Sequence, residues 1–450
     1  MKGVEDYLRR LDAFNPVKWT GRITKVLGTT LECEGFRSSV GDLCRVYSIQ
    51  GTRPIFAEVV GFREGRAILM PLSNLHGVGP GSQVTQWRKP LGVRVGDFLL
   101  GRVLDGLGHP IDGCGPLPED AEEWPLLRDS PQPLSREPVV RQLGSGIAAI
   151  DALIPIGRGQ RMGIFAGSGV GKSTLLGMIA KRSEADVNVI GLIGERGIEV
   201  RGFIEKVLGT AGLERSVIVV ATSDTPAQQR FKGAFLTITI AEYFREQGLQ
   251  VMMMMDSVTR LAAAIREIGL SRGEPPTVKG YPPSFYALLP QVVERLGATS
   301  QGSVTGLYTV LVEGDDMNDP VADTMRSLLD GHIVLSRDLA NKGHFPAIDV
   351  LSSTSRVMSD IVDRDHLELA RRFREVRATY DRHEDLINIG AYKSGTNPDI
   401  DRAIRAHAPM TDFLRQGAGD AFPPAEVRRR LERLIASAYS PAASGTEASS

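Results

Sequence analysis

A glycine-rich loop that ends in a lysine and two hydroxyl residues is the segment of the chain most specific for a defined chemistry. The loop consists of Ala166, Gly167, Ser168, Gly169, Val170, Gly171, Lys172, Ser173 and Thr174. It follows the apolar run MGIF and precedes the helix-like run LLGMIAK. Glycines allow successive backbone N–H groups to face phosphate oxygens, and the N-terminus of the following helix adds a positive dipole end. Lys172 can then reach the β- and γ-phosphates while the Ser173 hydroxyl binds Mg²⁺, so the loop predicts a nucleoside triphosphate site.

Two carboxylates that follow apolar runs could turn nucleotide binding into hydrolysis, which needs a metal-organising carboxylate, a group that positions water and nearby positive charge. Asp256 ends the run VMMMM, and Glu195 follows the run VNVIGLIG. A parallel sheet would bring both strand ends beside the loop, where Asp256 could hold the Mg²⁺ water shell and Glu195 could accept a proton from the attacking water. Other roles stay open, because Asp256 could also cap the helix SVTRLAAAIRE and Glu195 could form a salt bridge within a loop. Arg260, one helical turn after Asp256, could face the phosphates or lie in solvent.

The elements that must position these residues follow from apolar runs between about residues 144 and 350. Strand-like runs alternate there with helical stretches: MGIFAG, VNVIGLIG, SVIVVATS, VMMMMD, LYTVLVEG and GHIVLS. Near-continuous apolar strands between helices indicate an α/β domain whose parallel sheet is buried on both faces. The run Met252–Met255 is therefore interpreted as a core strand rather than as a metal-binding or ligand-binding surface.

The remaining segments divide the chain into further regions. Residues 1–16 place Val4, Leu8 and Leu11 at helical spacing, which predicts a short amphipathic helix or, alternatively, a frayed terminus. Short β-like runs separated by glycine-rich turns over residues 17–89 indicate a small β-barrel. The ATPase domain is expected over 90–350, beginning with Gly- and Pro-rich connections up to residue 143. Helical periodicity predicts a helical domain over 351–439, and small polar residues predict a disordered tail over 440–450.

Composition restricts the class of protein. The 450 residues are enough for two or three domains, and a net charge of -1 argues against a protein that coats polyanions. The three cysteines lack metal-ligand spacing and fit a reducing compartment. No signal peptide is recognisable at the start, and no apolar run reaches the roughly 18 residues of a membrane span. A cytoplasmic protein is therefore expected.

Several long blocks resemble one protein superfamily. The runs GRGQRMGIFAGSGVGKSTLLGMIA, GLIGERG and MMMMDSVTRLAAAIREIGL are similar to the rotary-type ATPases, which include the catalytic subunits of F-type ATP synthases. The runs GEPPTVKGYPPSFYALLPQVVERLG, EGDDMNDPVADTMRSLLDGHIVLSR and HFPAIDVLSSTSRVM narrow the resemblance to the type III protein-export ATPases, most of all the flagellar one. Over residues 17–440 this resemblance implies an N-terminal β-barrel, a RecA-like P-loop core and a C-terminal helical domain, assembled as a ring of six.

The resemblance also implies roles for single residues. Glu195 would polarise the attacking water, and Arg196 and Arg260 would lie near the phosphates. Arg356, in STSRVM, matches the arginine that the family inserts into the neighbouring subunit's site, where it would stabilise transition-state charge. Phe345, in GHFPAID, matches the aromatic position that packs on adenine, although its spacing alone also fits an ordinary core residue. Lys172 and Ser173 would keep the phosphate and Mg²⁺ roles, and Asp256 the role beside Mg²⁺.

Two positions depart from the usual patterns. The phosphate loop begins with Ala166 where the strict form has glycine, and its small side chain should fit because Gly167 and Gly169 supply flexibility. The family usually reads GERGREV, whereas Ile198 here replaces the second arginine and removes a positive charge beside the catalytic loop.

The resemblance favours a motor that hydrolyses ATP with Mg²⁺ and promotes chaperone release and delivery of flagellar proteins to a membrane export gate. It implies as partners a stator-like regulator, a central-stalk-like coiled coil, export chaperones with their cargo, and the gate, with peripheral association at the inner face of the cytoplasmic membrane. The alternatives are a virulence type III secretion ATPase, an ATP synthase catalytic subunit and a hexameric RNA translocase. No nucleic acid is expected, because the barrel region lacks a platform of aromatic and basic residues.

Overall fold

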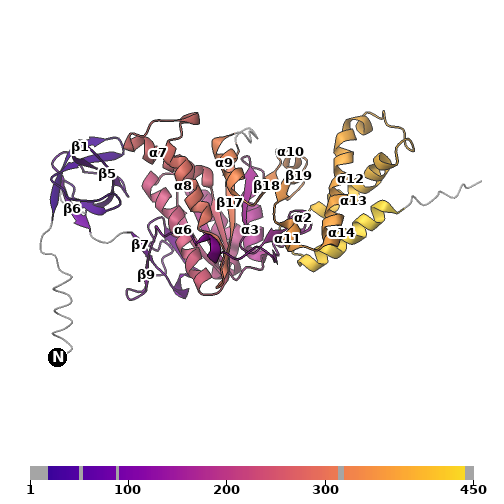
Figure 1. Ribbon diagram of the computed structural model, residues 1–450, viewed down its shortest axis with the longest axis horizontal. Helices are drawn as coiled ribbons and strands as arrows, with labels where there is room; N and C mark the ends of the chain where they lie inside the picture. The colour runs from indigo at the N-terminus through magenta and orange to yellow at the C-terminus, as the bar shows by residue number, and fades with distance from the viewer. Residues whose placement is uncertain (1–18, 50–53, 88–90, 313–318, 441–450) are drawn as a thin grey trace, which may run out of the picture.

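The computed structural model describes residues 19–49, 54–87, 91–312 and 319–440. The helix expected over residues 1–16 and residues 441–450 of the expected tail lie outside these ranges. The described chain forms an elongated molecule with a barrel at one end, an α/β core in the middle and a layer of helices at the other end (Figure 1). This arrangement confirms the predicted fold class.

The N-terminal part is a closed antiparallel barrel. Its strands are β1 (Thr20–Leu27), β2 (Thr30–Glu34), β3 (Leu43–Val46), β4 (Ile55–Arg63), β5 (Arg66–Pro71) and β6 (Gln83–Trp87), in the order β1-β2-β5-β4-β3-β6. Each strand coincides with one of the β-like runs in the sequence. Closure leaves no unpaired strand edge, and the interior is filled by a small apolar cluster that includes Ile23, Leu31 and Val84.

The core contains a nine-stranded, mostly parallel sheet. Six strands match the six apolar runs: β12 (Arg161–Ala166), β13 (Val187–Ile193), β14 (Ser216–Ala221), β15 (Gln250–Asp256), β17 (Ser303–Leu311) and β18 (Gly331–Leu335). The order is β19-β18-β12-β17-β15-β13-β14-β8, with β16 (Gly297–Ala298) paired to β17. The four methionines of β15 are fully buried and alternate between the two apolar layers that cover the sheet, which confirms that this run is a core strand.

Both edges of the sheet were missed in the sequence. The edge strand β8 (Val103–Asp105) pairs in parallel with β14, although it falls in the segment expected to form extended connections. The opposite edge strand β19 (Ile348–Ser355) is antiparallel to β18. The expected boundary after residue 350 therefore cuts β19, because the sheet extends to Ser355 and helical structure begins only after it.

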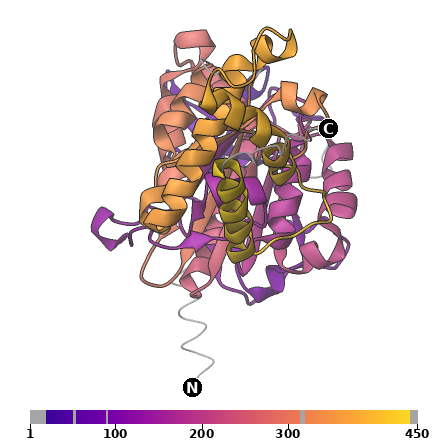
Figure 2. The ribbon, with the colours of Figure 1, turned by 90° about the vertical axis from the view of Figure 1, so that its right-hand side faces the viewer.

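Helices cover both faces of the sheet (Figures 1 and 2). The longer ones are α3 (Lys172–Arg182), α6 (Ala227–Glu246), α7 (Val258–Arg272), α8 (Pro283–Glu294) and α9 (Pro320–Leu328). The shorter helical segments are η1 (Asp97–Leu99), η2 (Pro133–Ser135), α2 (Ala148–Leu153), α4 (Gly197–Gly202), η3 (Phe203–Leu208), α5 (Gly209–Glu214), η4 (Val278–Gly280), α10 (Arg337–Asn341) and α11 (Met358–Ile361). Two small antiparallel pairs join β7 (Gly92–Arg94) to β9 (Glu123–Pro125) and β10 (Gln142–Leu143) to β11 (Ile156–Gly157). No helix in the described ranges is both long and apolar enough to cross a membrane.

The C-terminal layer consists of α12 (Arg364–Asn388), α13 (Pro398–Leu414) and α14 (Pro424–Tyr439). Their apolar faces share one continuous cluster with α2, α3 and one face of the sheet, through residues such as Phe373, Phe413 and Leu431. The helical layer is thus built onto the core, and movements at the junction must preserve this shared packing.

The barrel is joined to the core by a mixed contact. Val60, Ile68 and Met70 of the barrel pack in one apolar cluster with residues of α6 and α7. Beside this cluster, Glu58 of β4 and Lys232 of α6 form a buried ion pair at 2.8 Å. A buried pair fixes one docking geometry because separating its members leaves an uncompensated charge.

Candidate active site

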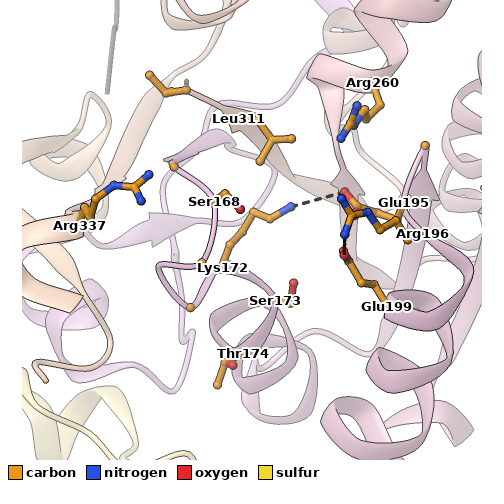
Figure 3. A pocket seen from close by; sticks show the side chains of 15 residues that line it. Ser168, Lys172, Ser173, Thr174, Glu195, Arg196, Glu199, Arg260, Leu311 and Arg337 are labelled. Atoms are coloured by element: carbon orange, nitrogen blue, oxygen red, sulfur yellow. Dashed lines mark ion pairs between the residues drawn. The ribbon is translucent and has the colours of Figure 1, made fainter. Parts of the chain in front are cut away.

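A cavity of about 610 Å³ lies at the carboxyl ends of the central strands, where open α/β sheets bind ligands. Its wall joins the loop after β12 to residues after β13, at the start of α7, at the end of β17 and at the start of α10. The lining residues are Gly167, Ser168, Gly169, Gly171, Lys172, Ser173, Thr174, Gly194, Glu195, Arg196, Glu199, Arg260, Leu311, Val312 and Arg337. Figure 3 shows charged side chains approaching the loop from several elements.

The glycine-rich loop connects a buried strand directly to a helix. β12 ends at Ala166 and α3 begins at Lys172. Gly169 and Gly171 have φ of 80° and 92°, a region that glycine enters without steric cost, so these two positions make the turn possible. Ala166 is buried and its carbonyl accepts a hydrogen bond from the Val312 N–H at 3.0 Å, so alanine is accommodated as the last strand residue. Val170 is also buried, so of the nine loop residues Ala166 and Val170 do not line the cavity.

Lys172 is paired with carboxylates from two neighbouring strands. Its Nζ contacts Asp256 at the end of β15 and lies 3.7 Å from Glu195 after β13. Asp256 is buried and accepts a 2.7 Å hydrogen bond from the Thr309 hydroxyl of β17. The sheet order β17-β15-β13 therefore brings together the lysine and both carboxylates that the sequence places far apart.

Asp256 is not the cap of α7, in contrast to one of the roles considered from the sequence. That position belongs to Ser257, whose hydroxyl accepts a hydrogen bond from the Arg260 N–H at 3.4 Å. The Asp256 carboxylate therefore interacts with Lys172 and Thr309 instead of capping the helix.

Glu195 has an unusual protonation equilibrium. Burial and then the nearby Asp256 charge raise its pKa from 4.5 to about 7, Lys172 opposes this rise, and a hydrogen bond with Glu199 adds to it. A carboxyl group with a pKa near the working pH can accept and return a proton efficiently. The geometry thus suits Glu195 to general base chemistry, as proposed from its place after a strand.

The arginines of the cavity differ in their setting. Arg196 is mostly exposed and lies 3.8 Å from Glu199, and Figure 3 draws this ion pair beside the one between Lys172 and Glu195. Arg260 packs its aliphatic stem against Gly194, where any side chain would collide with it. Arg337 reaches the opposite side of the loop from α10 (Figure 3).

Arg356 and Phe345 lie outside this wall. Arg356 follows β19, and because β19 runs antiparallel to β18, Arg356 lies near the amino ends of the parallel strands, whereas the loop of its own chain follows the carboxyl end of β12. Its guanidinium donates to the Arg326 carbonyl at 3.1 Å. The Phe345 ring is about half exposed and lies 3.6 Å from the position that a β-carbon on Gly171 would occupy. Phe345 therefore borders the loop, whereas Arg356 cannot serve the same chain's cavity.

Three residues of the site carried no recognisable signal in the sequence: Glu199, Thr309 and Arg337. Thr309 lies inside an apolar strand run, and its partner Asp256 becomes visible only with the strand order. Glu199 stands one turn into α4, close to Ile198, whose side chain is 77% exposed.

The donor set fits a divalent cation shared with phosphates. The described residues contain no cluster of three or more His, Cys, Asp or Glu side chains that could hold a metal ion alone. Mg²⁺ typically keeps several waters and takes only one or two protein ligands beside phosphate oxygens. The Ser173 hydroxyl and the neighbouring carboxylates match that requirement.

A phosphate loop between a parallel strand and a helix, faced by carboxylates from adjacent strand ends, defines a P-loop ATPase with a RecA-like core. Residues 146–355 match the ATP synthase alpha/beta family, nucleotide-binding domain, and residues 362–433 match the T3SS EscN ATPase C-terminal domain. The chain belongs to the family of type III export ATPases, which includes the flagellum-specific ATP synthases.

Relatives and solved structures agree over most of the chain. The flagellum-specific ATP synthase of Bacillus subtilis is 54% identical over 89% of this chain and 91% of that protein. The type 3 secretion system ATPase of Xanthomonas euvesicatoria is 49% identical over 88% of this chain and 89% of that protein. The assembled ATPase EscN of enteropathogenic E. coli superposes with a TM-score of 0.88 at 43% identity, covering 92% of this chain and all of that one. The structure of EscN with its central stalk EscO gives a TM-score of 0.85 at 42% identity, with the same two coverages.

Proposed function

We propose that this protein is the ATP-hydrolysing motor of a flagellar type III export apparatus. The observation that carries the proposal is the cavity in which Lys172, Glu195 and Asp256 meet, within a chain 54% identical to a flagellum-specific ATP synthase. In this role it releases chaperones from their cargo and delivers flagellar proteins to the membrane export gate, working at the cytoplasmic face of the membrane.

The chain's own residues divide the hydrolytic step among them. The loop N–H groups and Lys172 hold the phosphates. When ATP binds, Lys172 exchanges its carboxylate partners, Glu195 and Asp256, for phosphate oxygens. Ser173 would hold Mg²⁺ and Asp256 would order its water shell, and the ion would supply positive charge at the phosphates. Glu195 takes a proton from the attacking water, and Arg196 and Arg260 offer positive charge beside the phosphates.

The working unit is a ring of six chains, in which Arg356 of one chain completes the cavity of the next. The support is the position of Arg356, which is exposed and lies near the amino ends of the parallel strands, away from the site of its own chain. An arginine supplied in trans stabilises transition-state charge and makes hydrolysis depend on assembly. In this proposal the barrel of β1 to β6 serves assembly, and the helices after β19 face a stalk-like coiled coil. The similar ATPase EscN has been solved in complex with its central stalk EscO, which supports a stalk partner.

A virulence secretion ATPase is the second candidate, because the Xanthomonas type 3 secretion system ATPase is 49% identical. Deletion in the source cell, scored separately for motility, filament assembly and virulence secretion, distinguishes the two. A flagellar motor predicts lost motility and filaments, restored by the parent gene and not by Lys172→Ala, which removes the phosphate ligand while leaving the fold. Normal filaments together with lost virulence secretion would reject the flagellar assignment, and rescue by Lys172→Ala would reject the hydrolytic one.

A further inference from the structure

The loop between α13 and α14 joins the C-terminal helices to the surroundings of the nucleotide site. The first part of this loop, residues 415–420, lies against three segments of the core: the turn of residues 144–148, which leads into α2, the last residue of α3, and the backbone of Phe345. Arg182, at the end of α3, donates a hydrogen bond to the Ala418 carbonyl. Within the loop, the Gly417 N–H donates to the Asp420 carboxylate at 2.8 Å, which holds the loop closed on itself.

Gln416 provides most of these connections. Its side-chain oxygen accepts from the Ala148 N–H at 2.9 Å, and its side-chain nitrogen donates to the Gly146 carbonyl at 2.7 Å and to the Asp420 carbonyl at 2.9 Å. Its backbone N–H donates to the Phe345 carbonyl at 3.0 Å. Gln416 is 6% exposed, and removing its carboxamide would deprive the buried Ala148 N–H and the buried Gly146 carbonyl of this partner. The bond to the Phe345 carbonyl comes from the Gln416 backbone and does not involve the carboxamide.

The turn of residues 144–148, which receives the Gln416 hydrogen bonds, is itself held in place by several contacts. The Asp151 carboxylate of α2 accepts hydrogen bonds from the Ser145 N–H, the Ser145 hydroxyl and the Gly146 N–H at 2.8 to 3.0 Å. Gly146 packs so closely on Arg182 that an added β-carbon would lie 2.6 Å from the Arg182 β-carbon. The turn of residues 144–148, to which the Gln416 side chain is hydrogen-bonded, is therefore held both by α2 and by α3, the helix that begins at Lys172.

Phe345 is the part of this arrangement that faces outward. Its ring is about half exposed and borders Gly171 of the phosphate loop, while its backbone carbonyl is held from behind by Gln416. A base that stacks on this ring needs the ring at a fixed distance from the phosphate loop, because the phosphates and the base belong to one ligand.

We propose that Gln416 is a positioning residue for the nucleotide base, which holds Phe345 at the edge of the phosphate loop by joining the C-terminal helices to the turn of residues 144–148. This inference rests on the proposed ATPase function and on the placement of adenine against Phe345 that the sequence resemblance implies. Gln416 touches no reacting atom, so its effect falls on ligand binding through the base and not on the hydrolytic step.

The test compares ligands with and without a base in purified Gln416→Glu protein. The substitution keeps the shape and the acceptor for the Ala148 N–H, but places a carboxylate oxygen against the Gly146 and Asp420 carbonyls. ADP and inorganic tripolyphosphate are each measured as competitive inhibitors of ATP hydrolysis. We expect the ATP KM and the ADP inhibition constant to rise about tenfold, with kcat within about twofold of the parent and the tripolyphosphate inhibition constant unchanged. Gln250→Glu is the matched control, because the partly buried Gln250 is likewise a hydrogen-bonded amide, accepting from Ser303 at 2.6 Å, but lies at the far end of β15 from the site.

The outcomes separate this inference from the function on which it rests. An equal loss of ADP and tripolyphosphate binding would show a general defect and overturn the positioning role. An unchanged ADP constant in Gln416→Glu, with a raised one in Phe345→Ala, would overturn it as well. An unchanged ADP constant in Phe345→Ala would reject the base assignment, and the inference with it, while leaving hydrolysis by the Lys172 site intact. Gln416→Met, which removes all three side-chain hydrogen bonds at similar volume, carries the same test if Gln416→Glu does not fold.

Discussion

Replacing Glu195 by glutamine should make the nucleotide-free protein more stable at neutral and higher pH while abolishing rapid hydrolysis. Glutamine keeps the size and most of the shape of the side chain but cannot ionise. The cavity holds the Glu195 carboxyl beside the Asp256 charge and away from water, which raises its pKa from 4.5 to about 7. The ionised form that the chemistry requires is therefore the form that the fold tolerates poorly.

The magnitude follows from the pKa. A rise from 4.5 to about 7 corresponds to roughly 3 kcal/mol of differential stability between the protonated and ionised forms. Because the folded protein binds this proton more tightly than the unfolded chain, the stability contributed by Glu195 is present below about pH 4.5 and is lost as the pH rises through about 7. The Glu195→Gln protein cannot lose stability in this way. The difference in free energy of unfolding between this variant and the parent should therefore increase, in favour of the variant, by about 2 kcal/mol between roughly pH 5.5 and pH 8.

Urea unfolding without nucleotide or Mg²⁺, followed by tryptophan fluorescence at several pH values, measures this difference. Glu375→Gln, on the exposed side of α12, is the control and should follow the parent at every pH. The ATPase rate supplies a second readout, because kcat/KM of the parent should rise to a plateau with a midpoint near 7 and the variant should show no such limb. A stability difference that does not change with pH, or normal hydrolysis by the variant, would refute the role of Glu195.

Two further predictions concern assembly and the barrel. Arg356→Ala should lower kcat by about a thousandfold, and mixing its chains with Lys172→Ala chains should restore activity, since an intact finger then meets an intact loop; mixed chains as inactive as either parent would exclude the shared site. Lys232→Met should lower the free energy of unfolding by about 3–5 kcal/mol by leaving Glu58 charged and buried, whereas Lys232→Met combined with Glu58→Leu should recover most of it in urea unfolding. A single variant as stable as the parent would show that the pair does not fix the barrel.

Local sequence patterns predicted most helices and strands, but the contacts between residues far apart in the chain became visible only with the strand order of the structure. The glycine spacing placed the loop, and apolar runs with turn residues gave the barrel strands and the six main core strands. Edge strands were missed for physical reasons: β8 has only three residues between glycine-rich turns, and β19 is only partly buried and rich in serine, so neither forms an apolar run. Val103 and Leu104 of β8 are buried, so its short length alone conceals it, whereas β19 lacks a continuous apolar run because its burial is only partial.

The residues of the site likewise divide into those that local sequence patterns predict and those that only the folded structure reveals. Residues at strand ends, such as Glu195 and Asp256, were predictable because their place follows from the end of an apolar run. Thr309 and Gln416 were not, because the sequence separates them from their partners by 53 and 268 residues and their types occur throughout surfaces and cores. Their roles depend on which strands and helices become neighbours, and no local spacing encodes that.

The longest helix adds a mechanical property to the molecule. α12 has 25 residues and so extends roughly 37 Å from its base. Its base is anchored to the core, with His366 Nε2 2.8 Å from the Ala152 carbonyl oxygen and Arg374 donating to the Leu153 carbonyl, while Ile389 just beyond its far end is 75% exposed. A rotation of about 5° at the base carries the far end through about 3 Å for a helix of this rise. A rotation that shifts the atoms at the anchored base of α12 only slightly therefore displaces the far end of the helix by a much larger distance.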